Sequence, residues 1–368
     1  MKRILHIVGK MDRAGAETML MNLYRTIDKK QFQFDFMVFT RQKGDYDDEI
    51  KAMGGKIHLI VETNPIKRMF ALKRFLISHS EYTIVHCHTL LSNAFHVWAA
   101  KMAKVPFRIV HSHNTNDNSK SKIIREVYQF ISKKIIRKYS TNYISCGKKA
   151  ADFLFPNQKE VLFLPNAVDT HYLIKVGESS AEFITNEFQL KEGCLKIIQV
   201  GRLEIVKNPF FSLKLAENLK SKNIDFKLFF VGQGNLKVAI EQEILTKKLS
   251  DKVKLLGVRS DIPQLMAGAD VLLMPSFHEG FPVVLVESQS VGLPALISDS
   301  ISKEVDLGIN LIEFEALKTD MSVWVNKILT LKKNVKLPKK GRLGCLIKQG
   351  FDINSNTEKL IKLYNSLN

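Results

Sequence analysis

Residues 270–298, "DVLLMPSFHEGFPVVLVESQSVGLPALIS", contain two short apolar runs with one longer segment between them, and this pattern decides the fold. The end runs, "DVLLMPS" and "PALIS", are typical of strands that are buried on both faces. The segment between them predicts a helix, because Pro282 suits the first helical position and Gly292 followed by Pro294 ends it. The stretch therefore predicts a parallel sheet covered by helices.

The same alternation of apolar runs and amphipathic segments extends along the 368-residue chain. An early series includes "RILHIV", "FDFMVF" and "YTIVHCH", and a later one includes "LKIIQVG", "FKLFFVG" and "VKLLG". Residues 170–193 contain no clear buried strand, and the length fits two domains. We predict an α/β fold of two Rossmann-like domains, 1–170 and 171–352, which face each other across a cleft. A helix expected over 353–368 is predicted to pack back toward the first domain.

The composition limits the class of protein. The chain is 45% hydrophobic, which is ordinary for a globular protein. Its four cysteines have no paired spacing, so we expect no disulfide framework and place the protein in a reducing cytoplasm. No stretch approaches the roughly 18 apolar residues that span a bilayer. The net charge of +18 favours anionic partners, either phosphorylated ligands, an anionic membrane face or nucleic acid. Because no helix-turn-helix, RNP or zinc-knuckle motif occurs, we do not expect nucleic acid.

Two glutamates, Glu279 and Glu287, belong to the quoted stretch. Eight helical residues span about 12 Å, whereas carboxylate pairs that act on one glycosidic bond lie about 5 to 9.5 Å apart. The spacing therefore suits two acceptors that bind different parts of one hydroxyl-rich ligand. Between the two glutamates, the backbone N–H groups of Phe281 and Val283 lie at a helix N-terminus, where an anion is favoured. A ligand with hydroxyls at both ends and phosphate between them is a nucleotide-sugar. Alternatively, Glu279 caps the helix and Glu287 is solvated.

Cations and glycines follow other predicted strands. In "VGRLEIVKNP", Arg202 and Lys207 flank a loop that ends at a helix start, which predicts a diphosphate site or, alternatively, two surface cations. Gly232, in "VGQGNL", needs only to form a tight turn. Gly15, in "RAGAETM", leaves room for a ligand near the backbone.

Histidines end two predicted strands, as "HCH" at 86–88 and "HSH" at 111–113. Because side chains alternate along a strand, each pair has both rings on one face. A zinc site needs three or four converging ligands. We favour hydrogen bonds to sugar hydroxyls or a phosphate, and for any single histidine a satisfied buried side chain is the simpler interpretation.

Two predicted helices, 64–78 and 120–140, are strongly basic. The apolar stripe of the second consists of Ile124, Val127, Tyr128, Ile131 and Ile135. Such a helix can lie on an anionic membrane, or it can pack on its sheet with a solvated outer face. The cytoplasmic protein is therefore a candidate for peripheral binding to the inner membrane face.

Several motifs, taken in order, resemble those of the retaining glycosyltransferases of family 4, which have the GT-B fold. They are "AGAET", "LPNAVD", "GRLEIVKNP", "VGQGNLK", "LLGVRSDIPQLMAGADV" and "PSFHEGFPVVLVESQSVGLPALIS". The resemblance covers nearly the whole chain and is strongest over 195–300. Within the family, the chain is most similar to bacterial capsule and exopolysaccharide transferases.

This resemblance implies catalytic roles for four residues. Arg202 and Lys207 neutralise the donor diphosphate, Glu279 contacts the transferred sugar, and His113 contacts that sugar or the reacting centre. No cofactor and no metal are expected, since two cations and helix dipoles stabilise the leaving group. The leaving phosphate accepts the acceptor's proton on the same face of the sugar, so catalysis is positioning and charge stabilisation.

The resemblance also implies a donor site. Glu287 binds the ribose hydroxyls, Gly15 lies near the phosphates and the acceptor, and Arg259 flanks the base. The remaining donor-binding candidates are Gly201, Gly232, Gly280, Phe281, Pro282 and Val283. The donor is a UDP- or GDP-sugar, and the acceptor is a glycan, expected to be lipid-linked.

Two positions depart from the family pattern, and two other functions stay open. Ala14 and Ala167 stand where glycine is usual, which leaves the backbone conformation at Ala167 in question. The alternatives are a nucleotide-sugar epimerase and a non-catalytic nucleotide-sugar-binding subunit of a transferase.

Overall fold

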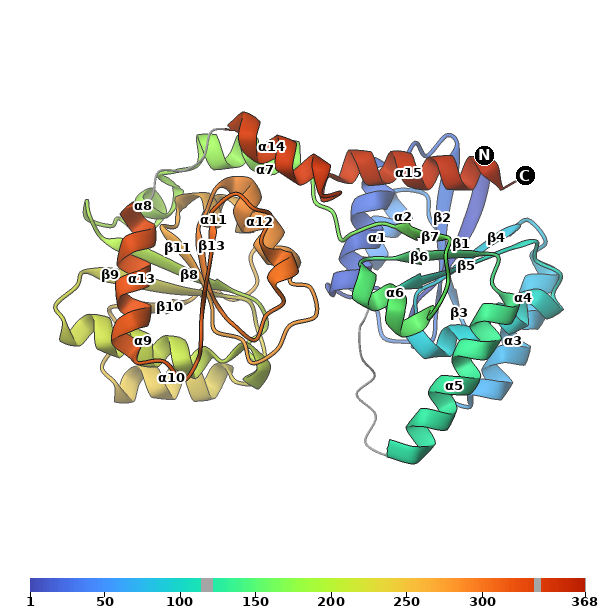
Figure 1. The fold of residues 1–368 in the computed structure, drawn as a ribbon, viewed down its shortest axis with the longest axis horizontal. Helices are drawn as coiled ribbons and strands as arrows, with labels where there is room; N and C mark the ends of the chain where they lie inside the picture. Colours follow the sequence, from blue (N-terminus) through green and yellow to red (C-terminus); the bar gives the residue numbers. More distant parts are fainter. Residues whose placement is uncertain (114–121, 334–338, 368) are drawn as a thin grey trace. The chain divides into compact units, whose positions relative to one another are not determined.

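The computed structural model describes residues 1–113, 122–333 and 339–367, with only the backbone at 122–124, 333, 339 and 340 (Figure 1). It divides into two compact units. The N-terminal unit consists of Met1–Ala167 with Ile353–Asn368, and the C-terminal unit of Val168–Asp352.

The N-terminal unit is built on a seven-stranded parallel sheet in the order β3-β2-β1-β4-β5-β6-β7. Its strands are β1 (Lys2–Ile7), β2 (Phe32–Val38), β3 (Ile57–Leu59), β4 (Ile84–Cys87), β5 (Phe107–Ser112), β6 (Asn142–Ser145) and β7 (Val161–Phe163). Alternate residues face opposite sides, so Ile4 and Ile84 belong to one buried cluster and Leu5 and Val85 to another.

Helices cover both faces of this sheet (Figure 1). On the Ile4 side lie α1 (Gly15–Thr26), α2 (Asp47–Ala52) and α15 (Ile353–Ser366). On the other side lie α3 (Pro65–Ser78), η1 (Leu90–Ser92), α4 (Asn93–Met102), α5 (Lys122–Tyr139) and α6 (Lys148–Leu154). The last helix of the chain therefore completes the core of the first unit.

The C-terminal unit is built on a six-stranded parallel sheet in the order β10-β9-β8-β11-β12-β13. Its strands are β8 (Leu195–Val200), β9 (Phe226–Val231), β10 (Val253–Leu255), β11 (Val271–Met274), β12 (Ala295–Ser298) and β13 (Ile312–Glu315). Its helices are α7 (Thr170–Ser179), α8 (Phe183–Glu187), η2 (Ile205–Lys207), α9 (Pro209–Ser221), α10 (Lys237–Thr246), α11 (Ile262–Gly268), α12 (Val283–Val291), η3 (Lys303–Val305), α13 (Met321–Lys333) and α14 (Lys339–Lys348).

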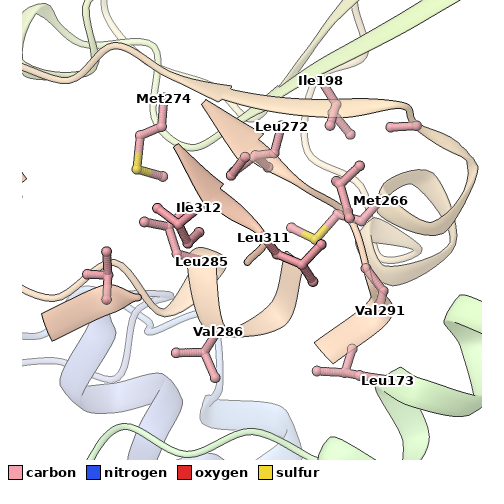
Figure 2. Close-up of a cluster of buried hydrophobic side chains, with 14 of the residues drawn as sticks. Leu173, Ile198, Met266, Leu272, Met274, Leu285, Val286, Val291, Leu311 and Ile312 are labelled. Atoms are coloured by element: carbon pink, nitrogen blue, oxygen red, sulfur yellow. The ribbon is translucent and has the colours of Figure 1, made fainter. Parts of the chain in front are cut away.

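Apolar packing holds α12 against this sheet. Figure 2 shows Leu285 of α12 on the side of the helix that faces Leu272 and Met274 of β11, and Val286 on the opposite side; all four side chains are buried. Burying a leucine or valine side chain contributes roughly 1.5–3 kcal/mol. The helix that carries Glu287 is therefore fixed on the sheet before any ligand binds.

The predicted fold class is confirmed, because each unit is a parallel sheet covered on both faces. The quoted stretch forms β11, α12 and β12, with Pro282 as the residue before α12 rather than inside it. Gly292 ends the helix in a left-handed conformation, with φ of 83°. Among the described helices, none combines the length and apolar character that crossing a membrane requires.

The two basic helices form, but the apolar stripe predicted for the second is largely not buried. On α5, Val127, Tyr128 and Ile131 are exposed, and Ile136 packs into the core instead. Ile135 is half-buried, and the side chain of Ile124 lies outside the described residues. Because helical periodicity shows only that apolar residues share a face, it could not show what covers that face.

Candidate active site

Three loops at the carboxyl ends of β8, β9 and β11 are joined through their backbones. The N–H of Phe277, after β11, donates to the carbonyl of Val206, after β8, at 2.9 Å. Gly232, after β9, has φ of 133°, and a Cβ there would lie 2.1 Å from the carbonyl oxygen of Gly201. Only glycine permits this approach, so these glycines are structural parts of one loop cluster.

Lys207 and Glu279 meet in this cluster. The Nζ of Lys207 donates to Oε1 of Glu279 at 2.6 Å, and both side chains are largely buried. Seventy-two residues separate them in the sequence, and η2 and the loop before α12 bring them together. The ion pair holds a cation at the strand ends, where parallel sheets bind ligands.

A buried polar pair supports Lys207, and sequence reasoning missed it. Gln199, on β8, donates through Nε2 to the carbonyl oxygen of Lys207 at 2.9 Å. Ser212, on α9, donates to Oε1 of Gln199 at 2.6 Å. The only available signal was a glutamine inside the apolar run "KIIQVG".

The two predicted arginines have other partners. Arg202 is exposed, and its guanidinium donates to Glu204 at 2.7 Å rather than to the Lys207–Glu279 pair. Arg259 is held by Asp261 at 2.6 Å and Glu187 at 2.9 Å, and these hydrogen bonds raise its pKa. Neither arginine shares a carboxylate with Lys207 in this structure.

Glu287 lies in a different environment from Glu279. It is half-buried on α12, and no group of the described residues donates a hydrogen bond to its carboxylate. Burial raises the pKa of Glu287 to about 7. A half-buried carboxylate without a donor is suited to accept hydrogen bonds from a bound ligand.

Gly280 through Val283 lead into α12. The backbone at Gly280 is open, since a Cβ there would meet nothing within 4 Å. Phe281 stacks on Phe351 with ring centroids 5.3 Å apart, and this contact positions the backbone before the helix. Val283 is the first residue of α12, next to the unpaired N–H groups of the helix start.

In the N-terminal unit, Gly15 begins α1 and faces Asn166. A Cβ at Gly15 would lie 3.9 Å from Nδ2 of Asn166, whose Oδ1 is buried without a partner among the described residues. The motifs "AGAET" and "LPNAVD" therefore meet. Ala167 does not have a positive φ, so alanine fits the backbone there.

His113 directly follows β5 and is half-buried. Its Nε2 lies 2.9 Å from Nδ1 of His88, and burial lowers its pKa to about 3, so the ring is neutral. As predicted, each "HxH" motif has both rings on one face, with ring centroids 4.3 Å apart for His86 and His88 and 4.0 Å for His111 and His113.

Two family models match the chain, one in each half. Residues 13–172 match the model described as Glycosyltransferase Family 4, and residues 180–339 match Glycosyl transferases group 1. EpsF of Bacillus subtilis (strain 168), a glycosyltransferase by name, is 35% identical over 99% of this chain and 96% of its own length.

Other relatives are named for capsule or lipid-linked sugar transfer. CapH of Staphylococcus aureus, a capsular polysaccharide biosynthesis glycosyltransferase, is 23% identical over 100% of this chain and 99% of its own. A UDP-Gal:alpha-D-GlcNAc-diphosphoundecaprenol alpha-1,3-galactosyltransferase of Escherichia coli is 27% identical over 73% of this chain and 72% of its own.

Solved structures share the fold. Anabaena HepE, solved in complex with UDP, matches 100% of both chains with a TM-score of 0.78 and 16% identity. WaaG, a glycosyltransferase involved in lipopolysaccharide biosynthesis, matches 98% of this chain and 99% of its own with a TM-score of 0.66 and 17% identity.

The chain therefore belongs to the family 4 glycosyltransferases and has the GT-B fold. It is an enzyme of the hexosyltransferase class. The epimerase and accessory-subunit alternatives are set aside, because both halves match transferase models and the relatives above are named as transferases.

Proposed function

We propose that this enzyme transfers a hexose, with retention of configuration, from a nucleoside-diphosphate sugar to a lipid-linked glycan in capsule or exopolysaccharide synthesis. The named activities of the capsule and diphosphoundecaprenol relatives support this proposal. The observation that carries it is the pairing of Lys207 with Glu279 beside a helix start, together with Glu287, whose carboxylate accepts no hydrogen bond from the described residues.

The proposed donor site follows from these environments. The diphosphate binds Lys207 and Arg202, with Arg202 exchanging its exposed partner Glu204 for phosphate oxygens. Glu279 both orients Lys207 and accepts hydroxyls of the transferred sugar. Glu287 accepts the ribose hydroxyls, and the N-terminus of α12 contributes N–H groups to the phosphates.

The proposed transfer uses positioning and charge rather than a pair of carboxylates. The bond between the anomeric carbon and the leaving phosphate oxygen breaks, while the acceptor hydroxyl attacks from the same face. The acceptor's proton passes to a phosphate oxygen, and Lys207 neutralises the negative charge on the nucleotide. Lys207 and Arg202 are proposed to supply the positive charge that a divalent metal ion supplies in other transferases. His113 is proposed to hydrogen-bond the sugar through its Nδ1, which has no partner among the described residues, whereas its Nε2 faces His88.

An acceptor site is proposed on the N-terminal unit. A pocket of about 370 Å³ is lined by Lys10, Arg41, Lys43 and Lys51, with Asp47 as an acidic neighbour. Most of these residues follow β1 and β2, at the edge of the sheet where ligands bind parallel sheets. The excess of positive charge suits an acceptor that carries a diphosphate.

A membrane surface is proposed on α3 and α5. On α5, Val127 (54%), Phe130 (60%) and Ile131 (49%) are exposed beside lysines, and α3 exposes Ile66 and Phe70. An adjoining pocket of about 230 Å³ is lined by apolar side chains with three cations, Lys133, Lys134 and Arg137. Exposed apolar groups between cations suit an anionic lipid surface.

A panel of nucleotide-sugars tests the function. We expect one UDP- or GDP-sugar to raise the melting temperature, and its nucleotide to be released only when a cell-envelope lipid extract is added. Lys214→Ala, an exposed lysine on α9, serves as the matched control for Lys207→Ala. Donor binding without nucleotide release in any extract would contradict the proposed transfer.

A further inference from the structure

Five histidines form a ladder on one face of the N-terminal sheet. His6 is on β1, His86 on β4 and His111 on β5, and these strands are neighbours, with His6 and His86 in register. His88 and His113 directly follow β4 and β5. Neighbouring rings have centroids between 4.0 Å and 5.5 Å apart.

The ladder has too few hydrogen-bond partners for a buried polar cluster. Hydrogen bonds join His6 Nδ1 to His88 Nε2 at 3.1 Å, His88 Nδ1 to His113 Nε2 at 2.9 Å, and His86 Nδ1 to the hydroxyl of Tyr364 at 2.9 Å. Among the described residues, nothing pairs with either nitrogen of His111, which is 1% exposed. Buried polar groups are nearly always paired, so these nitrogens point to a ligand.

The chemistry of the ladder suits a transition metal. An imidazole has an ordinary pKa of about 6.5, so above pH 7 each ring is mostly neutral and has one nitrogen lone pair that can bind a metal. Neutral imidazoles prefer Zn²⁺, Co²⁺, Ni²⁺ or Cu²⁺, whereas Mg²⁺ and Ca²⁺ prefer oxygen ligands.

We propose that His88, His111 and His113 bind a divalent transition-metal ion, such as Zn²⁺. One ring nitrogen from each lies within 4.8 Å of the other two. Zn–N bonds of about 2.0–2.1 Å in a tetrahedral site need nitrogens roughly 3.3 Å apart, close to the 2.9 Å that separates His88 Nδ1 and His113 Nε2. His111 completes the set by a small ring movement.

His6 would act as the outer partner of this site. When Nδ1 of His88 binds the metal, the proton of this ring is on Nε2. The Nε2–H group then donates a hydrogen bond to Nδ1 of His6, which lies 3.1 Å away. A second set, His6, His86 and His88, also converges within 4.8 Å. We assign the ion to the first set because neither nitrogen of His111 has a partner among the described residues, and because His113 is only half-buried, so that water or an anion could supply a fourth ligand.

The inference does not rest on the proposed function, because metal binding is measured without substrate. The full chain, freed of any affinity tag and of metal, is titrated with Zn²⁺ in competition with a chromophoric chelator. We expect one ion per chain with a dissociation constant in or below the micromolar range. Cobalt in its place should give the visible absorption of a four-coordinate nitrogen site.

Variants locate the site. We expect His111→Ala and His113→Ala each to weaken Zn²⁺ binding by about 100-fold or more, and His6→Phe by about 10- to 100-fold, as for other outer partners. His171→Ala, an exposed histidine on α7, should change nothing. If His111→Ala fails to fold, Zn²⁺ binding by His113→Ala still tests the site, because His113 is only half-buried. No stoichiometric binding, or binding unchanged by His113→Ala, would overturn the assignment.

Discussion

Lys207 is held by two kinds of contact: its Nζ forms an ion pair with Glu279, and its backbone carbonyl accepts a hydrogen bond from the side chain of Gln199. The cation that we propose to bind phosphate is thereby positioned before any ligand binds. We expect Lys207→Ala to lower kcat by about 10²- to 10³-fold, the usual loss on removing one group that stabilises developing negative charge. Lys214→Ala is the control, and steady-state kinetics is the measurement. Near wild-type turnover in Lys207→Ala would contradict the proposal that Lys207 binds the donor diphosphate.

The proposed role of Glu287 predicts that donor binding depends on pH. Because its pKa is raised to about 7, the carboxylate is partly protonated at neutral pH and accepts ribose hydroxyls fully only above that value. We expect the affinity for the nucleotide to rise between pH 6 and 8. In Glu287→Gln the affinity should be lower and nearly constant across this range, as measured by calorimetry. The same pH profile in both proteins would contradict the role.

The same shift has a consequence for stability. A carboxyl group whose pKa is higher in the folded state stabilises the fold at low pH, and this contribution is lost as the pH rises from about 4.5 through about 7. The loss is on the order of 3 kcal/mol at most. Glu287→Gln should therefore be more stable than the wild type at pH 8, by denaturant unfolding. Equal stability there would contradict the buried, donor-free carboxylate.

At the scale of elements, the contact between the loops after β8 and β9 depends on Gly232. A methyl group there would overlap the carbonyl oxygen of Gly201, and the positive φ disfavours any other residue. We expect Gly232→Ala to destabilise the C-terminal unit by roughly 2 kcal/mol or more. Gly280→Ala, where the space is open, is the matched control and should keep its melting temperature. Equal melting temperatures would contradict the backbone contact.

The exposed face of α5 is the element that we propose to contact lipid. Moving one large apolar side chain out of lipid costs about 1.5–3 kcal/mol, which is roughly 10- to 100-fold in binding. We therefore expect Phe130→Ser with Ile131→Ser to reduce co-sedimentation with anionic vesicles by at least about tenfold. Val238→Ser, an exposed position on α10, is the control. Unchanged sedimentation of the double variant would remove α5 from the membrane proposal.

Local patterns predicted the elements well, since strand and helix periodicities are properties of neighbouring residues. The runs "DVLLMPS" and "PALIS" predicted β11 and β12, and Pro282 and Gly292 predicted the ends of α12 to within one residue. The partners of Lys207 and Arg202 could not be predicted in this way. Glu279 is 72 residues from Lys207 in the sequence. Arg202 pairs with Glu204 rather than with Glu279, and this choice depends on the loop conformation, which the spacing of residues does not predict.

At the scale of the whole molecule, each unit has its own core, and α15 belongs to the first. Leu360 and Tyr364 pack against α1 and the β1–β2 region and are fully buried. We expect Leu360→Ala to cost about 2–5 kcal/mol, chiefly in the N-terminal unit. Hydrogen exchange should then rise over residues 1–113 and not over 168–333. Leu245→Ala, an exposed leucine on α10, is the control. A uniform rise in exchange would contradict the division into units.

The place of α15 also bears on how the enzyme is made. The chain leaves the first unit after Ala167 and returns to it at Ile353, beside the bridge between Val168 and Asp352. While the ribosome is still translating the last helix, the continuous segment between these points is already synthesised and able to fold. The first sheet, although translated earlier together with α1 and α2, keeps the part of its apolar face that α15 covers exposed until α15 emerges. Nascent chains are therefore expected to depend on chaperones until α15 has left the ribosome.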